Sequence, residues 1–505
     1  MPEFQQPPLR KESETTILTL DAGSSSVRTL LYDGQGREVP GFGLHLPYEL
    51  RATASGGVEV DADFLCGLCV HSLSAIHAQI TASHVRPAAV AVCTFWHNVL
   101  GVDGNGQPTT PVLHSFDTQS AGAVPQLARR LDPLGVHART GCVLHPSYLP
   151  AKLTWLAEAR PAAFRNTQRW MSCGEYLFLK LFGTPAASTC MVSGSGLWNQ
   201  NSNTYDRETL RALPVDLNQL APENEMDWPA RGLRSEYATQ WPLLATIPWF
   251  PALGDGAANN VGCGCSARDQ FALMVGTSGA LRAVVEAPRM EAPEGLWVYR
   301  LDSTRFVVGG ALTNGGGVYA WMKKTLNLPP AAEIEAALDA MPAASHGLTV
   351  LPLFAGERSP GWRADARAAI IGLRADSSPL QILRASLEAV ALRFRLIYDI
   401  LRRSLADPNQ IIATGGALLH SPAWTRMMAD ALARPVIPCL EEEATSRGAA
   451  LVALERLGAI DNVSEVPATL GQPMQPSPAS VPLYERAVEL QSGLYRKLFQ
   501  EIGPA

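Results

Sequence analysis

Apolar and polar positions along the chain predict strands that alternate with helices. Short apolar runs such as ILTL and AAVAV are bounded by turn-forming residues, which is typical of buried strands. The clearest helix signal begins at Ser378, an expected N-cap, with Pro379 in the first helical position. Its apolar residues recur on one helical face at Leu380, Leu383, Leu387, Val390 and Ala391. We therefore expect an α/β fold.

The same patterns place the other main elements. We expect strands over residues 17–20 and 27–32, joined by a Gly/Ser turn, and a further strand in the segment AAVAVCTFWHNVLGVD. Residues 58–80 are expected to form a helix entered after Asp61. Further helices are predicted over residues 318–322, 445–457 and 483–499.

The length and the spacing of these elements predict more than one domain. A chain of 505 residues is long for a single core. We expect a flexible tail over residues 1–15, a first lobe over 16–247, a second lobe over 248–470, and a C-terminal linker and helix over 471–505.

An acidic residue between two glycines is the strongest candidate for chemistry. Asp255 lies between Gly254 and Gly256, after the apolar run IPWFPALG and before AANNVG, which can open a helix. Glycine permits the tight path that exposes a carboxylate at the carboxyl end of a strand, where open α/β sheets place their active sites. Taken alone, GDG is also an ordinary β-turn sequence.

A Gly/Ser turn near the N-terminus is a candidate phosphate site. Asp21 ends the first predicted strand, and the following turn includes Ser24 and Ser25, with Arg28 shortly after it. Backbone N–H groups and hydroxyls of such a turn can bind phosphate oxygens, and the aspartate is suited to hold Mg²⁺. A simple capped hairpin is the competing interpretation.

Other glycine-rich turns repeat this pattern. Gly276 and Thr277 lie between two predicted strands, and Arg282 follows them as Arg28 follows the first turn, which suggests a weak internal duplication. Further glycine clusters precede helices, and helix N-termini attract anions. Two such lobes could hold one nucleotide; the additional clusters include Gly310, Gly315 to Gly317, Gly415 and Gly416.

Polar residues interrupt one apolar strand. Trp96, His97 and Asn98 are expected either to face a sugar or to be satisfied within the core, since buried polar groups need partners. Asp117 follows in a loop, where capping is an alternative role. Lys152, near the start of a helix, is expected to be exposed.

Composition narrows the functional class. The net charge of -6 and the isoelectric point near 6.0 give no electrostatic case for nucleic-acid or anionic-membrane binding. Cys66 and Cys69 form a lone CxxC that is best explained by helix packing, and nothing demands disulfides. The N-terminus lacks a signal-peptide core, so we expect a cytoplasmic protein without a membrane span.

The chain lacks the common nucleotide and hydrolase motifs. There is no Walker sequence, no GxSxG, no HExxH and no protein-kinase signature set. Instead, five segments in order resemble the FGGY family of carbohydrate kinases, over residues 17 to about 458. These segments are LDAGSSSVR, GDGAANNVG, VGTSGALR, LPLFAGERSPGW and ATGGALLHSPAWTRMMADAL.

The resemblance implies a fold, an activity and a set of roles. Members have two ribonuclease-H-like lobes of the actin/hexokinase type, with ATP and sugar in an interlobe cleft. By this resemblance Asp255 is the catalytic base, Asp21 is associated with Mg²⁺, and Trp96, His97 and Asp117 contact the sugar. The implied ATP-binding residues are Ser24, Ser25, Arg28, Gly276, Thr277, Gly310, Gly415 and Gly416.

The identity of the sugar is less constrained. The family's usual tryptophan and arginine around Asp117 are replaced here by Ser115 and Gln119. GDGAANNVG, VGTSGALR and TGCVLHPSYLPAKLTWL look most similar to gluconokinases, with xylulokinase or another pentulose or polyol kinase as the alternative. We expect a small-molecule substrate and leave open a homodimer.

Three other classes compete with a sugar kinase. An actin-like or chaperone-like ATP switch would keep the fold, but the Trp-His-Asn cluster and GDG argue against it. A sugar-responsive repressor would need a helix-turn-helix segment, for which the tail before Ile17 has no room. A catalytically silent homologue is disfavoured because Asp21 and Asp255 are both present.

Overall fold

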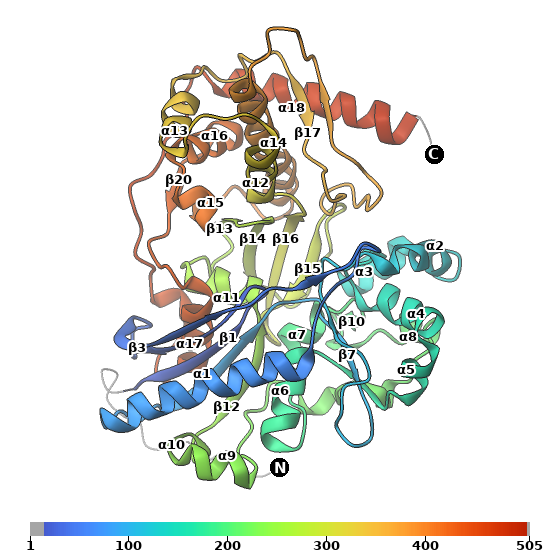
Figure 1. Ribbon diagram of the computed structural model, residues 1–505, viewed down its shortest axis with the longest axis vertical. Helices are drawn as coiled ribbons and strands as arrows, with labels where there is room; N and C mark the ends of the chain where they lie inside the picture. The colour runs from blue at the N-terminus through green and yellow to red at the C-terminus, as the bar shows by residue number, and fades with distance from the viewer. Residues whose placement is uncertain (1–14, 502–505) are drawn as a thin grey trace.

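The computed structural model describes residues 15–501 and has two lobes, each built around a mixed β-sheet (Figure 1). The first sheet has the strand order β12-β6-β1-β2-β3, and the second has the order β15-β16-β14-β13-β19-β20. In each lobe an antiparallel hairpin, β1–β2 or β13–β14, is followed by a strand that joins it in parallel, β6 or β19. The expected two-lobe α/β fold is confirmed, and the duplicated hairpins are real.

The strands of the first sheet are β1 (Ile17–Ala22), β2 (Ser26–Tyr32), β3 (Glu38–Pro47), β6 (Ala89–Thr94) and β12 (Trp249–Gly254). Those of the second are β13 (Gln270–Val275), β14 (Gly279–Glu286), β15 (Trp297–Arg300), β16 (Arg305–Leu312), β19 (Gln410–Thr414) and β20 (Val436–Pro438). Short strands outside these sheets are β4 (Arg51–Ala52), β5 (Val58–Val60), β7 (Leu100–Val102), β8 (Val112–Leu113), β9 (Arg169–Met171), β10 (Trp198–Asn199), β11 (Thr204–Tyr205), β17 (Thr349–Leu351) and β18 (Ala369–Ile371).

The helices of the first lobe and the linking region are α1 (Ala62–Ala82), α2 (Ala123–Ala128), α3 (Pro133–Thr140), α4 (Leu149–Ala159), α5 (Pro161–Asn166), α6 (Cys173–Phe182), α7 (Thr189–Ser193), α8 (Arg207–Arg211), α9 (Ser235–Gln240), α10 (Pro242–Ala245) and α11 (Asp255–Gly262). Those that follow are α12 (Gly316–Thr325), α13 (Ala331–Ala340), α14 (Pro379–Ser404), α15 (Gly416–Leu419), α16 (Pro422–Leu432), α17 (Ala444–Arg456) and α18 (Val481–Arg496).

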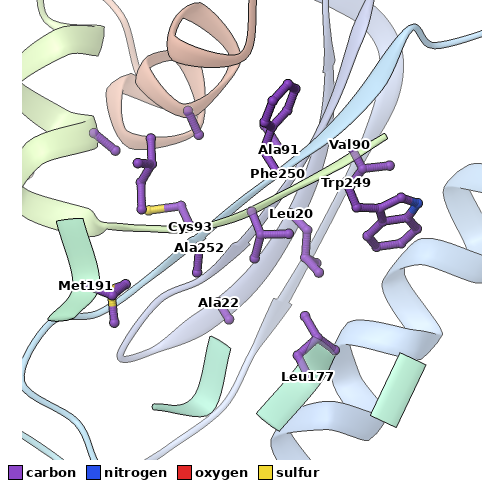
Figure 2. Close-up of a cluster of buried hydrophobic side chains, with 14 of the residues drawn as sticks. Leu20, Ala22, Val90, Ala91, Cys93, Leu177, Met191, Trp249, Phe250 and Ala252 are labelled. Carbon is purple, nitrogen blue, oxygen red and sulfur yellow. The ribbon is translucent and has the colours of Figure 1, made fainter. Parts of the chain in front are cut away.

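The boundary expected at residue 248 is wrong, because β12 belongs to the first sheet. Trp249 of β12 pairs in parallel with Val90 of β6, and both side chains lie with Leu20 of β1 in one apolar cluster (Figure 2). Figure 1 shows α17, near the red end of the chain, beside the blue strands of this lobe, and α17 contacts β1 and β6. A buried apolar strand does not reveal from its sequence which sheet it joins.

Helix boundaries follow the capping signals. Helix α14 begins as expected, with a capping box between Ser378 and Gln381. Helix α1 begins at Ala62, and Asp61 accepts a hydrogen bond as its N-cap, whereas residues 58–60 form β5 instead of the predicted helix. Val58, Glu59 and Val60 alternate between apolar and polar, as in a strand. They form β5 instead of the first turn of the helix because β5 pairs with β4 and β8.

Helix α1 also accounts for two sequence features. Cys66 and Cys69 are buried within it, as expected for helix packing. By length and composition alone, α1 is the one helix in residues 15–501 that passes the criteria for a membrane span. It contacts β2 and β3, and its buried residues belong to the core of the first lobe.

The structure describes the C-terminal helix but not the first 14 residues of the chain. Residues 1–14, which make up nearly all of the predicted tail, lie outside the described residues. The C-terminal helix α18 packs against α14 and β17, and the buried Gln491 donates hydrogen bonds to the carbonyl groups of Val350 and Ala389. The predicted C-terminal helix is thus part of the second lobe.

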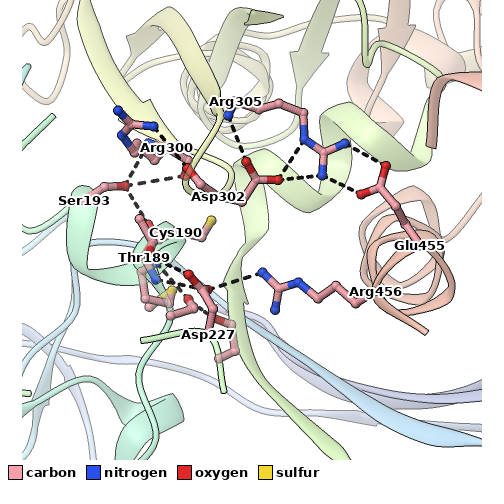
Figure 3. Close-up of polar contacts among 12 residues, drawn as sticks. Thr189, Cys190, Ser193, Asp227, Arg300, Asp302, Arg305, Glu455 and Arg456 are labelled. Atoms are coloured by element: carbon pink, nitrogen blue, oxygen red, sulfur yellow. Dashed lines mark hydrogen bonds and ion pairs between the residues drawn. The ribbon is translucent and has the colours of Figure 1, made fainter. Parts of the chain in front are cut away.

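A polar network joins the lobes at one side (Figure 3). Arg305, at the start of β16, pairs with Asp302 and with Glu455 of α17, each at 2.5 Å. Arg456 of α17 pairs with Asp227 at 3.3 Å. Ser193 accepts a 2.9 Å hydrogen bond from the backbone N–H of Arg300. We call these residues, with Thr189, the hinge network.

Candidate active site

Asp255 lies at the junction of a strand and a helix, as the sequence predicts. Strand β12 ends at Gly254 and α11 begins at Asp255, so the GDG sequence does not form a hairpin turn. The backbone N–H groups of Gly256 and Trp96 donate to Asp255 Oδ1 at 2.8 and 3.3 Å. A Cβ atom on Gly254 would come within 2.1 Å of the Trp96 ring, which explains the glycine.

The charge environment of Asp255 comes from the second lobe. Burial raises the pKa of the Asp255 carboxyl, and the guanidinium groups of Arg282 and Arg358 oppose that rise. Arg282 lies in β14, and Arg358 lies in the loop after β17. Asp255 is therefore located where the two lobes meet, and a carboxylate balanced in this way can accept or orient a proton.

Asp21 lies near Asp255 at the end of β1. Its carboxyl is almost completely buried and its Oδ1 has no hydrogen-bond partner. Burial raises the pKa of Asp21 to about 7, with Arg28 lowering it and Asp255 and Glu443 raising it further. An unpartnered buried carboxylate oxygen fits a role in holding a divalent cation.

The first candidate phosphate turn joins β1 to β2. The Gly23 N–H donates to the Ser26 carbonyl at 3.0 Å, which closes the turn and leaves Ser24 half-buried and Ser25 exposed. Arg28 points back toward carboxylates, with Nη1 at 3.1 Å from Glu443 and 3.7 Å from Asp21. The turn can present hydroxyl groups to a ligand, while Arg28 partly offsets the rise that burial causes in the pKa of Asp21.

The second turn is assembled with the start of two helices. The N–H groups of Gly315 and Gly317 donate to the Thr277 carbonyl at 3.0 and 2.9 Å, and that of Gly316 donates to the Gly276 carbonyl at 2.7 Å. A Cβ atom on Gly316 would lie 2.9 Å from Ala417 of α15. The second turn, α12 and α15 therefore converge.

Gly415 and Gly416 open α15 beside the second turn. Gly415 has a φ of 89°, and a Cβ atom there would come within 2.4 Å of the Val275 carbonyl oxygen. Glycine is required by both the conformation and the close approach. The two glycines therefore lie with Gly276 and Thr277.

Gly310 does not lie with this group. It is buried inside β16, paired across from Leu281, and a Cβ atom on it would come within 2.8 Å of Ile397 in α14. Packing of helix against strand accounts for this glycine. The glycines that do reach the second turn are Gly315, Gly316 and Gly317, which the sequence also singles out.

Asn259 connects the catalytic helix to the nucleotide side, a role that the sequence analysis missed. It lies one helical turn after Asp255, and its Oδ1 accepts hydrogen bonds from Thr414 at 3.2 Å and Arg282 at 3.3 Å. Thr414 ends β19 immediately before Gly415. The available signal was the i, i+4 spacing from Asp255.

The Trp-His-Asn cluster divides between two roles. Trp96 is buried and donates from Nε1 to the Cys190 carbonyl, and Asn98 accepts from the N–H of Cys173, so both are satisfied in the core. His97 has a φ of 62°, an uncommon conformation for a side chain of this size. Strained residues of this kind concentrate at functional sites, and His97 remains half-buried.

Lys152 is buried, so the expectation that it is exposed is wrong. Its ammonium donates to the carbonyl groups of His97 at 2.6 Å and His114 at 2.8 Å. Burial lowers the pKa of Lys152 to about 7, and Asp117 opposes that change. The sequence offers no signal for this, since a lysine near a helix start is normally solvated.

Asp117 holds the backbone of its own loop. Its Oδ2 accepts from the Val58 N–H at 3.0 Å, and its Oδ1 accepts from the Gln119 N–H at 3.1 Å. Asp117 is 1% exposed, and burial raises its pKa. These contacts favour the local structural role, and a sugar contact by Asp117 stays a prediction.

Aromatic rings from both lobes surround His97. The ring centroids of Tyr148 and Tyr299 lie 5.1 and 5.2 Å from that of His97, and the two tyrosine hydroxyls share a 2.6 Å hydrogen bond. Burial lowers the pKa of His97 to about 3, so the ring is neutral at pH 7. Aromatic walls with a few fixed polar groups are typical of small-molecule sites.

Family models match the two lobes of this chain separately. The model of the N-terminal domain of the FGGY family of carbohydrate kinases matches residues 16–262, and that of the C-terminal domain matches residues 271–455. The chain is 25% identical over 482 residues to a gluconokinase of Bacillus subtilis (strain 168), covering 92% of this chain and 91% of that protein.

Two solved structures have the same architecture. A gluconate kinase and a ligand-bound xylulose kinase, both from Lactobacillus acidophilus, superimpose with TM-scores of 0.87 at 25% identity. Each alignment covers 96% of this chain and 98% of the other. The two family models together span nearly all of both lobes, and the chain belongs to the FGGY family of carbohydrate kinases.

Proposed function

We propose that this carbohydrate kinase transfers the γ-phosphoryl group of ATP to a terminal hydroxyl of gluconate. The observation that carries the proposal is the Asp255 carboxylate, held by two backbone N–H groups and faced by Arg282 and Arg358. Similarity to gluconokinases along the whole chain supports the choice of sugar. The reaction needs a base at the hydroxyl and charge neutralisation at the phosphates.

In this mechanism Asp255 orients the hydroxyl and accepts its proton as the phosphoryl group arrives. Arg282 stabilises the carboxylate before transfer, and Asn259 fixes Arg282 relative to β19. The turns at Ser24–Ser25 and Gly276–Thr277 bind phosphate oxygens through hydroxyl and N–H groups. The Trp96 ring packs against Gly254 and Gly256, on either side of Asp255, and in this way helps to exclude water, which would otherwise compete as an acceptor.

Asp21 is the proposed residue for Mg²⁺. Its buried Oδ1 lacks a partner, and in residues 15–501 no group of three or more His, Cys, Asp or Glu side chains forms a separate metal site. Bound Mg²⁺ would supply charge neutralisation to the phosphates. A single carboxylate together with substrate phosphates is the usual environment for this ion.

A xylulose kinase is the runner-up. The xylulose kinase of Lactobacillus acidophilus superimposes as well as the gluconate kinase, so architecture alone does not separate them. An ATP switch that acts without a sugar is the alternative of another class. Location in the cytoplasm and assembly as a homodimer remain proposals that rest on composition and on the family resemblance.

A coupled ADP-release assay across gluconate, xylulose, ribulose, glycerol, erythritol and fuculose tests the proposal. We expect the highest kcat/KM with gluconate and little ADP release without a sugar. A higher value with xylulose would replace gluconate by the runner-up. ADP release that no sugar accelerates would favour the switch.

A further inference from the structure

Lys152 of α4 is a fully buried cation that has no ion-pair partner among residues 15–501. Its Nζ donates to the carbonyl groups of His97 and His114 at 2.6 and 2.8 Å. The buried guanidinium of Arg384, in contrast, pairs with Glu388. Because an apolar side chain of similar size would fill the space of a buried cation at no electrostatic cost, we looked for a role of the ammonium at the two carbonyl groups.

The two carbonyl groups belong to segments that leave different strands. His97 lies in the loop after β6, and His114 directly follows β8. These segments pair through backbone hydrogen bonds between Val99 and Leu113, at 2.9 and 3.2 Å. Lys152 joins the same segments at a second place and ties both of them to α4. It therefore fixes the position of the loop after β6 within the first lobe.

The backbone of His97 requires support of this kind. Its φ of 62° lies in the left-handed region, which a residue other than glycine keeps only where its surroundings hold it there. A hydrogen bond of 2.6 Å between Nδ1 and the Gly194 carbonyl holds the ring. A cavity of about 40 Å³, lined in part by His97, Asn98 and Trp170, leaves the apolar packing incomplete on one side. The bond from Lys152 is the contact that holds the carbonyl group of this turn.

The residue before this turn contacts the candidate base. The backbone N–H of Trp96 donates to Asp255 Oδ1 at 3.3 Å, whereas that of Gly256 donates to the same oxygen at 2.8 Å. An N–H···O bond of 3.3 Å is already longer than the usual range, so a small shift of the loop would break it. The orientation of the Asp255 carboxylate thus depends on where the turn at His97 is held.

We propose that Lys152 is a positioning residue for phosphoryl transfer, which bonds the His97 carbonyl and thereby directs the Trp96 N–H at the Asp255 carboxylate. The inference rests on the proposed function, in which Asp255 accepts the proton of the sugar hydroxyl. Lys152 acts through Asp255 and not on the substrate. A carboxylate that loses one of its two N–H donors can rotate away from the hydroxyl, and rates fall steeply with small displacements of reacting groups.

Direct binding of the sugar by the Lys152 ammonium is the competing assignment, because an ammonium can also donate to a hydroxyl or a carboxylate. The two assignments differ in the kinetic parameter that they control. Direct binding affects the KM for the sugar. Positioning affects kcat, and its effect disappears when the Asp255 carboxylate is absent.

The test is a double-mutant cycle of Lys152→Met and Asp255→Asn, assayed with gluconate and ATP. We expect Lys152→Met to lower kcat about 10- to 100-fold, with both KM values within about threefold of the wild type. In the Asp255→Asn enzyme, which lacks the base, the same substitution should lower kcat by less than about twofold. This loss of additivity is the sign of a residue that acts through Asp255.

Two further variants support the cycle. Lys152→Gln keeps N–H donors on a shorter side chain, so it should recover part of the loss in kcat, and it takes the place of the methionine variant in the cycle if that variant fails to fold. Lys180→Met, in α6 of the same lobe, is the matched control. Lys180 is partly exposed and pairs with Asp63 at 3.3 Å, and its substitution should change neither kcat nor KM.

The outcomes separate the two claims. Near-wild-type kcat in Asp255→Asn rejects the proposed base, and the inference falls with it. A large loss in Asp255→Asn, combined with an unchanged kcat in Lys152→Met, rejects the inference alone. A rise in the KM for gluconate without a fall in kcat assigns Lys152 to the substrate, and an equal fall in kcat with and without the Asp255 carboxylate assigns it a general structural role. Each of these two results also overturns the inference.

Discussion

Two of the regions where the lobes meet differ in how far their polar groups are paired. In the hinge network Arg305 contacts two carboxylates, Arg456 contacts a third, and Ser193 bonds Arg300 (Figure 3). Around the candidate site, the Nε atoms of Arg282 and Arg358 and the Nε2 atoms of two histidines lack partners. The paired groups of the hinge network hold the lobes together. The unpaired groups around the candidate site are available to a ligand.

The contrast has an energetic meaning. Each buried polar group without a partner costs about 1–3 kcal/mol, whereas a satisfied pair largely recovers its desolvation. Unpaired polar groups can be retained in a binding site because a bound ligand supplies their hydrogen bonds and offsets the cost of burying them. We therefore expect changes in the hinge network to affect stability, and changes in the site to affect substrate kinetics.

The largest expected effect is that of Asp255→Asn on turnover. The amide keeps the size and the hydrogen bonds to Gly256 and Trp96 but cannot accept the proton, so kcat should fall at least about 10²–10⁴-fold. ATP binding, measured by calorimetry, should stay close to that of the wild type. Asp339→Asn, an exposed carboxylate of α13, is the control. Turnover near the wild-type value would remove Asp255 from its role.

Arg305→Met in the hinge network is expected to reduce stability without changing substrate kinetics. The substitution leaves Asp302 and Glu455 without their shared cation, and both are mostly buried. We expect the free energy of unfolding in urea to fall by about 3 kcal/mol. The KM for gluconate should not change, and a large rise in that KM would erase the distinction between the two regions.

A smaller effect is predicted for the pH dependence of Mg²⁺ activation. The pKa of Asp21 is about 7 in the folded protein and 3.8 in an ordinary environment, so below pH 7 the cation must displace a proton. The Mg²⁺ concentration for half-maximal rate should rise about tenfold per pH unit on going below pH 7. Asp21→Asn should remove this dependence, and a wild-type requirement that is flat between pH 5.5 and about 7 would contradict it.

Asp21 also has an opposite effect on stability. Because folding raises its pKa, the folded state binds the proton more tightly than the unfolded state. The contribution of Asp21 to the free energy of unfolding is therefore greatest below pH 3.8 and is lost as the pH rises to about 7. The free energy of unfolding is therefore lower at the pH at which the Asp21 carboxylate is ionised and able to bind a cation.

The smallest effect is expected on the outer surface. Arg426 and Asp339 form an ion pair at 3.1 Å whose side chains are both about half exposed. Arg426→Gln should change the free energy of unfolding by at most about 0.5 kcal/mol and leave kinetics unchanged. A loss comparable to that of Arg305→Met would show that pairing alone, without burial, holds the lobes.

The sequence was sufficient where local chemistry decides the structure. The strand-to-helix position of Asp255, the turn after Asp21, and the cap of α14 at Ser378 all follow from glycine placement and capping rules, and the structure has them. The turns at Gly276 and Gly415 also come together, because each ends a strand of the same sheet.

Local sequence rules do not predict which distant segments a strand, helix or side chain will contact. Strand β12 joins the first sheet although it directly precedes the second lobe, and α17 returns to the first core after the second sheet is complete. Lys152 is buried because two carbonyl groups from distant segments meet it. Gly310 is explained by a helix that begins far along the chain.

The most direct test of the account is a crystal structure with gluconate and a non-hydrolysable ATP analogue. We predict that a terminal hydroxyl of gluconate lies within hydrogen-bond distance, about 3 Å, of the Asp255 carboxylate, with the γ-phosphate beyond it. A sugar bound away from Asp255, with that carboxylate still covered by protein, would contradict the account.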